Sequence, residues 1–197
     1  MPPWSRTLGA CQPIASASPP AGLRRMPNDP AESPMSLLIL LRHAKAEAVA
    51  PSGRDADRAL TGRGLRDAAI IGRALAAGGF APRRALVSTA RRAAQTWDAV
   101  SPAFDLAASA VEHRSDLYLA SCERLFKAAQ ANKGEALIIV GHNPGLHELA
   151  LALLGDDPKG RLDGFPTAAA AVFELEPGGG AQLIQLLTPR DLGGGAA

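Results

Sequence analysis

The sequence predicts an α/β fold, a three-layer α/β/α sandwich in which helices cover both faces of a mostly parallel central sheet. Two runs of residues, 36–42 and 136–141, are almost continuously apolar, a pattern typical of strands buried on both faces. Segments with apolar residues at helical spacing lie between such runs, and the two kinds of segment alternate along the chain. In sheets of this kind ligands bind beyond the carboxyl ends of the strands.

Helix boundaries are marked by residues with known preferences. Thr61 can cap the first helix with its hydroxyl, and Gly78 with Gly79 ends that helix. Pro102 closes the second helix, and Pro144 starts the last one. In chain order the predicted elements are a strand at 36–42, a helix from Thr61 to Gly78, a strand at 84–88, helices at 90–100 and 121–131, a strand at 136–141, a helix at 144–154, and strands at 168–175 and 182–187.

The chain of 197 residues fits one domain with an extension at each end. Eight of its 16 prolines precede Met35, and the residues around them are mainly Ala, Ser and Gly. Such a segment buries too little apolar surface to offset its ordering entropy. We therefore expect a disordered N-terminal extension at 1–34, the functional domain at 35–192, and a flexible tail at 193–197.

Composition excludes several classes of partner. A formal net charge of +2 is too small to indicate nucleic-acid binding. Apolar runs such as Leu37 to Leu41 are far shorter than a membrane span, and residues 1–34 lack the apolar core of a secretory signal. We expect a cytoplasmic protein that contacts neither nucleic acid nor membrane. The sequence leaves its oligomeric state open.

The polar residues that carry chemistry follow three of the predicted strands. Arg42 and His43 end the first strand, Arg91 and Arg92 follow the second, and His142 ends another. Guanidinium groups bind phosphate oxygens bidentately and stay charged at physiological pH. Imidazole can attack as a neutral base or donate a proton as a cation. Two arginines with two histidines suit an anion that must be held and attacked, and phosphate fits best.

Four motifs in the same order resemble those of the histidine phosphatase superfamily, which includes the phosphoglycerate mutases. Arg-His-Ala at 42–44 resembles its Arg-His-Gly signature, and 60–64 resembles its Leu-Thr-x-x-Gly turn. Residues 88–96 resemble its Ser-x-x-x-Arg-Ala-x-x-Thr segment, and 141–143 match the segment that bears its second catalytic histidine. The resemblance implies a phosphoglycerate mutase-like fold.

The resemblance also implies roles for individual residues. His43 would attack phosphorus and become phosphohistidine, which water then hydrolyses. Arg42, Arg92 and His142 would bind the equatorial oxygens and neutralise their charge. These cations would make a metal unnecessary, so we expect neither a metal nor a cofactor. A metal site formed by His142 and His147 is disfavoured, because a spacing of five residues does not align two side chains on a helix face.

The leaving group needs a proton donor. In the family a carboxylate follows the strand after the helix that begins at Arg92, and Asp116 is the best-placed candidate, with Glu112 second. We expect Asp57 and Arg58 to form a surface ion pair rather than line the pocket. Tyr118 is expected to be a packing residue.

The length of the chain between the motifs narrows the function. Only 50 positions separate Arg92 from His142, too few for the long insertion of phosphoglycerate mutases. This favours a compact phosphohistidine phosphatase, whose partner is a protein phosphorylated on histidine. A general phosphatase of small phosphorylated metabolites is the alternative on the same site. A further alternative is a non-catalytic module that binds phosphorylated partners. Loss of His43 or Arg92 would favour that alternative, and both residues are present.

Overall fold

A single six-stranded sheet runs through the centre of the computed structural model, which describes residues 36–155, 162–176 and 180–194. Four neighbouring strands are parallel, and two antiparallel strands extend the sheet at one side. The sheet order is β3-β2-β4-β1-β5-β6. The strands are β1 (Ser36–Arg42), β2 (Arg84–Ser88), β3 (Val111–Arg114), β4 (Leu137–Gly141), β5 (Ala170–Leu175) and β6 (Ala181–Leu187).

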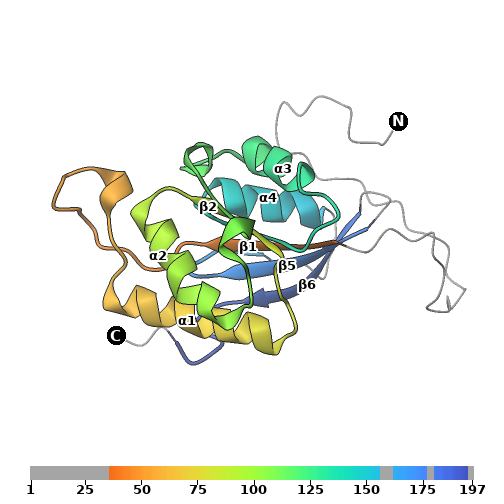
Figure 1. Cartoon of the computed structure of the whole chain (residues 1–197), viewed down its shortest axis with the longest axis horizontal. Helices are drawn as coiled ribbons and strands as arrows, with labels where there is room; N and C mark the ends of the chain where they lie inside the picture. The colour runs from red at the N-terminus through yellow and green to blue at the C-terminus, as the bar shows by residue number, and fades with distance from the viewer. Residues whose placement is uncertain (1–35, 156–161, 177–179, 195–197) are drawn as a thin grey trace, which may run out of the picture.

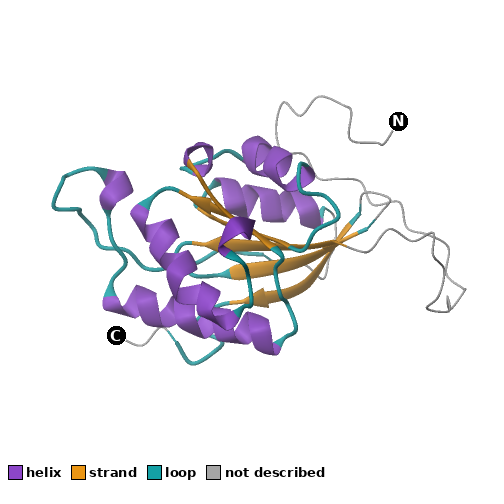
Figure 2. Cartoon of the chain, in the orientation of Figure 1, coloured by secondary structure: helices purple, strands orange, loops and turns teal. Residues whose placement is uncertain are grey.

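Four α-helices cover the two faces of this sheet (Figures 1 and 2). One face carries α1 (Gly62–Ala77) and α2 (Arg91–Val100), and the other carries α3 (Cys122–Gln130) and α4 (Gly145–Leu154). Short 3-10 turns join them, namely η2 (Asp55–Asp57), η3 (Ser101–Ala103), η4 (Ala108–Ala110) and η5 (Ser115–Leu117). The three layers confirm the predicted α/β/α sandwich.

Alternation along β1 explains why its sequence is apolar throughout. Leu38 and Leu40 belong to the core under α3 and α4, whereas Ile39 and Leu41 belong to the core under α1 and α2. Successive strand residues point to opposite faces, so a strand covered on both sides needs apolar residues at every position. β4 repeats the pattern, and all five of its residues are buried.

Most predicted element boundaries are confirmed within one or two residues. Thr61 caps α1, with its hydroxyl accepting a hydrogen bond from the Gly64 amide at 3.0 Å. The structure adds β3, which the apolar pattern did not predict. This strand is short, lies at the sheet edge and has no fully buried residue, so it lacks the apolar run that marks a central strand.

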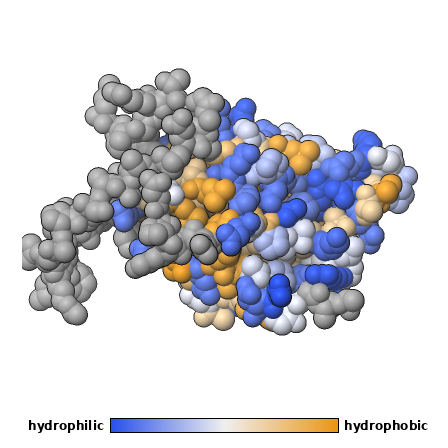
Figure 3. All heavy atoms as spheres, turned by 180° about the vertical axis from the view of Figure 1, so that it is seen from behind, coloured by the Kyte–Doolittle hydropathy of each residue, from blue (hydrophilic) through white to orange (hydrophobic). Residues whose placement is uncertain are grey.

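The expected extension at 1–34 lies outside the described residues, as does the end of the expected tail, 195–197. None of the described helices is both long and apolar enough to cross a bilayer. Seen from behind, the described surface is largely hydrophilic, with apolar groups between the polar ones (Figure 3).

The topology brings three strand ends to one edge of the sheet. β4 lies between β1 and β2 and is parallel to both, and Arg42 on β1 is in register with Gly141 on β4. The first residue after β1, His43, donates its backbone amide to the Gly141 carbonyl at 3.0 Å. The residues that follow β1, β2 and β4 therefore meet at this edge.

Candidate active site

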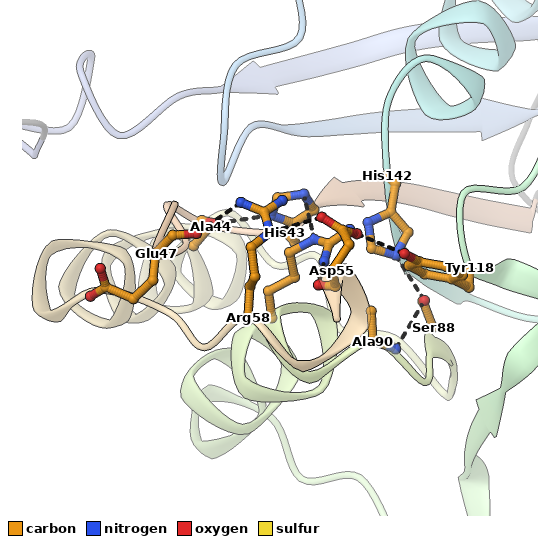
Figure 4. A network of polar contacts seen from close by, with 10 residues as sticks. His43, Ala44, Glu47, Asp55, Arg58, Ser88, Ala90, Tyr118 and His142 are labelled. Carbon is orange, nitrogen blue, oxygen red and sulfur yellow. Dashed lines mark hydrogen bonds and ion pairs between the residues drawn. The ribbon is translucent and has the colours of Figure 1, made fainter. Parts of the chain in front are cut away.

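Two histidine side chains meet at the carboxyl edge of the sheet. His43 follows β1 and His142 follows β4, and their ring centroids lie 5.1 Å apart. Only 9% of His43 and 2% of His142 is exposed to solvent. Figure 4 shows both rings in one network of polar contacts. Both predicted histidines are thus brought together by the fold.

The contacts of His43 fix which of its nitrogens carries the hydrogen. Nδ1 lies 2.9 Å from the backbone carbonyl oxygen of Ala44, which can only accept, so Nδ1 donates. Nε2 then has the free electron pair and accepts a hydrogen bond from Arg92 Nε at 3.3 Å. Burial, followed by the positive charges of nearby arginines, lowers the pKa of His43 from 6.5 to about 4. His43 is therefore a neutral imidazole at neutral pH, with its electron pair on Nε2.

His142 is oriented by a serine at the end of β2. Its Nε2 lies 2.8 Å from the hydroxyl oxygen of Ser88, and the Ala90 amide approaches the same oxygen at 3.4 Å. That oxygen accepts from Ala90 and still has one hydrogen and one lone pair, so it can either donate to His142 Nε2 or accept from it, and the ring hydrogen lies on Nδ1 in the first case only. Burial and the charge of nearby cations lower the pKa of His142 to about 3. Nδ1 is buried and has no hydrogen-bond partner among the described residues.

Two arginines lie beside these rings. Arg92, at the start of α2, is only 2% exposed and extends its guanidinium between His43 and Asp55. Arg42, at the end of β1, donates from NH1 to the Phe165 carbonyl at 2.7 Å, whereas its Nε is buried without a partner. Burial lowers the pKa of Arg42. Both predicted arginines therefore lie at the histidine pair.

Asp55 is a site residue that the sequence did not reveal. It lies in η2 and receives hydrogen bonds from Arg92 NH2 at 2.9 Å, Tyr118 OH at 2.6 Å and Arg58 Nε at 2.8 Å. These contacts, the one from Tyr118 above all, lower the pKa of Asp55 to about 2. The carboxylate balances the charge of the buried Arg92 and holds its guanidinium in place.

The expected ion pair between Asp57 and Arg58 is not present. Asp57 pairs instead with Arg54 at 2.7 Å, and Arg58 pairs with Asp55 and lines the cleft. Adjacent residues in a short 3-10 turn point in different directions, and Arg58 reaches back three positions to Asp55. Tyr118 contacts the site directly, because its ring stands edge-on to His142 with centroids 5.5 Å apart.

Two further motif residues hold the loop after β1 in place. The Thr96 hydroxyl accepts from the Ala44 amide at 3.0 Å and donates to the Arg92 carbonyl at 2.6 Å. At Gly64 an added Cβ would lie 2.1 Å from the Lys45 carbonyl oxygen, so only glycine allows α1 to approach the loop this closely. These contacts explain the threonine and the final glycine of two of the motifs.

The site opens into a cleft of about 370 Å³. Four of its lining residues are cations and one is a carboxylate, so the cleft favours an anionic ligand. Within the described part of the chain, no three His, Cys, Asp or Glu side chains come together as a metal-binding group would require. The lining residues are Arg42, His43, Lys45, Ala46, Asp55, Arg58, Arg92, Leu119, His142, Asn143 and Thr167.

The two carboxylates predicted as proton donors do not line this cleft. Asp116 is bound by Arg114 through both oxygens, at 3.0 and 2.7 Å, and these bonds lower its pKa. Glu112 faces Arg84 at 3.3 Å and Arg114 at 3.9 Å. The Asp116 carboxylate, tied to Arg114, stays ionised at neutral pH, a state unlike that of a proton donor.

Known proteins resemble this chain in sequence and in fold. Residues 38–125 match the model of the histidine phosphatase superfamily, branch 1. An uncharacterized protein of Mycobacterium leprae is 32% identical in an alignment of 151 positions, which covers 68% of this chain and 87% of that protein. The SixA chain of Agrobacterium tumefaciens is 33% identical with a TM-score of 0.68, covering 79% of this chain and 99% of that one. The chain belongs to the histidine phosphatase superfamily.

Within this superfamily the similar structures include bacterial SixA proteins. The Agrobacterium chain is assigned as a phosphohistidine phosphatase. Another SixA structure, described as a protein histidine phosphatase complexed with tungstate, is 26% identical with a TM-score of 0.69 and covers 79% of this chain and 99% of that one. The family resemblance and the phosphoglycerate mutase-like fold expected from the four motifs are both confirmed.

Proposed function

We propose that this member of the superfamily is a phosphohistidine phosphatase, which removes the phosphoryl group from a histidine of a partner protein through a phosphorylated His43. The observation that carries the proposal is the state of His43, a buried neutral imidazole with its free electron pair on Nε2. The 26% identical SixA structure is described as a protein histidine phosphatase, and tungstate is a tetrahedral oxyanion like phosphate.

In the first step His43 Nε2 forms a bond to phosphorus, and the bond from phosphorus to the substrate nitrogen breaks with its electron pair going to that nitrogen. In the second step water attacks phosphorus and gives up one proton to the solvent, which balances the proton that the departing substrate nitrogen takes from the solvent in the first step. The electron pair of the N–P bond then returns to His43 Nε2, and orthophosphate leaves. The Ala44 carbonyl keeps the ring in the same tautomer throughout.

Charge on the transferring oxygens is met by donors that already lie at His43. We assign this role to Arg42, Arg92 and His142. Arg42 Nε and His142 Nδ1 are buried without a partner among the described residues. A phosphoryl oxygen would accept from Arg42 Nε, and from His142 Nδ1 in the tautomer in which Ser88 donates to Nε2. Arg92 is held beside His43 by its two hydrogen bonds to Asp55, and its Nε hydrogen would pass from His43 Nε2 to a phosphoryl oxygen when Nε2 attacks.

We further propose that the reaction needs no metal, because arginines supply the positive charge that a metal ion would otherwise provide. The P–N bond of phosphohistidine is labile, so a carboxylate poised to protonate the leaving nitrogen is less necessary than for an alkyl phosphate. The positions of Asp116 and Glu112 beside arginines agree with this. Only the phosphorylated side chain of the partner would enter the cleft, since 370 Å³ is near the lower end for ligand pockets.

Rapid quenching tests the proposal. The wild-type protein is mixed with histidine-phosphorylated protein in excess chelator and quenched within milliseconds. We expect acid-labile, alkali-stable phosphate on His43, and no labelling or turnover in His43→Ala. His113→Ala is the matched control, because His113 lies on β3 away from the cleft. Label on serine, cysteine or aspartate, or activity that returns only with added metal, would refute the mechanism.

A further inference from the structure

The cleft contains one large apolar side chain that phosphoryl chemistry does not explain. Leu119 lines the cleft and is 53% exposed. Apart from Ala46, the other lining residues are polar or charged. An isolated exposed leucine is ordinary on a protein surface, but this one forms part of the wall around a buried catalytic pair.

The backbone at Leu119 is in an unfavourable conformation. Its φ is 49°, in the left-handed region that a bulky residue rarely adopts and that glycine adopts freely. Such outliers persist where the surrounding structure enforces them, and they cluster at sites of function. The turn before α3 thus contains a large side chain at a position where glycine would be more stable.

Residues on both sides of Leu119 hold the turn against the site. The Tyr118 hydroxyl donates to Asp55, and its ring contacts His142. On the other side, an added Cβ at Gly145 would lie 2.0 Å from the Ala120 carbonyl oxygen, so the turn is pressed against the start of α4. The position of Leu119 at the cleft is therefore set by the contacts of its neighbours.

We propose that Leu119 is the residue that recognises the leaving group, by covering the flat apolar face of the substrate imidazole. The proposal rests on the function proposed above. Arg42, Arg92 and His142 are assigned above to the phosphoryl group, so an apolar side chain in the same cleft would face what is attached to that group. An imidazole ring gains from apolar cover, whereas a polyhydroxylated sugar or a bare amine does not.

The test compares two substrates in the full-length protein. Phosphohistidine peptide carries the ring, and phosphoramidate has the same P–N bond without it. The ratio of their kcat/KM values isolates the contribution of the ring, because loss of phosphoryl binding affects both. We expect Leu119→Ala to lower this ratio about tenfold, mainly through KM for the peptide. Leu151→Ala is the matched control, since Leu151 is a 44% exposed leucine on α4 outside the cleft lining.

Leu119→Gly separates recognition from a structural role. Glycine adopts a left-handed φ without strain, so we expect the Tm of Leu119→Gly to be unchanged or higher than that of the wild type. We expect the ratio of the two kcat/KM values to fall as it does in Leu119→Ala. A ratio within twofold of wild type in both Leu119 variants would overturn the inference and leave the phosphatase proposal intact. Turnover of phosphoramidate but not of the peptide by the wild-type protein would instead overturn the proposed substrate, and this inference with it.

Discussion

The hydroxyl of Thr96 offers a sharp test of how the catalytic loop is held. Replacing Thr96 by Val keeps the shape of the side chain and removes the oxygen that binds the Ala44 amide at 3.0 Å. The amide is then buried without a partner, which costs about 1–3 kcal/mol. For a domain of this size we expect Tm to fall by roughly 2–12 °C, since each kcal/mol corresponds to about 2–4 °C.

We expect Thr96→Val to slow phosphorylation of His43 by more than its lower stability explains. Ala44 follows His43 directly, and its carbonyl fixes the tautomer of the ring. A displacement of about 1 Å at a reacting group can reduce the rate about 100-fold, so we expect phosphorylation of His43 in Thr96→Val to slow by up to that factor. The assay is rapid-quench measurement of phosphoenzyme formation well below the Tm of the variant.

Thr96→Ser is the matched control, because it keeps the hydroxyl and loses only a methyl group. We expect the serine variant to form phosphoenzyme at close to the wild-type rate, even though the missing methyl lowers its Tm slightly. Equal rates in the valine and serine variants would show that the bond to Ala44 does not position His43.

Three further outcomes are expected. The pKa of His43 is lowered to about 4 and that of His142 to about 3, so near pH 6.5 both histidines take up protons in the unfolded chain but not in the folded one. The urea midpoint of unfolding should therefore fall as the pH drops from about 6.5 toward 4. An NMR titration of His43 with a midpoint near pH 6.5 would contradict this expectation. Asp116→Asn should slow the turnover of alkyl and aryl phosphates by the same factor, because the Asp116 carboxylate is bound to Arg114. A selective loss of turnover of alkyl phosphates would identify Asp116 as the proton donor. A chain that begins at Met35 should fold and keep its rate of phosphoryl transfer, since all described strands and site residues follow it; a large drop in Tm on truncation would show that residues 1–34 contribute to stability.

Local patterns were sufficient for most of the fold. Strands buried on both faces must be apolar at every position, as β1 and β4 are, and helix caps such as Thr61 leave a signature in adjacent residues. The apolar pattern did not predict the edge strand β3, because a short, exposed strand needs no such pattern and is defined by its pairing with β2.

The sequence by itself determined which residues meet at the carboxyl edge of the sheet. Arg42 and His43 directly follow β1, and His142 follows β4, so parallel pairing of these strands is enough to bring them together. Arg92 is placed in the same way by the start of α2 after β2. Residues attached to strand ends have little freedom, which is why their positions can be read from the motifs.

Only the tertiary structure decided how the loops complete the site. Asp55 reaches Arg92 across 37 positions and Tyr118 across 63, and neither pairing leaves a periodic signal in the sequence. Asp116 follows β3 as expected, but its carboxylate turns to Arg114, because a charged side chain near the surface binds the nearest available cation. Loop side chains select partners by proximity in the folded chain, and proximity exists only once the sheet and helices have assembled.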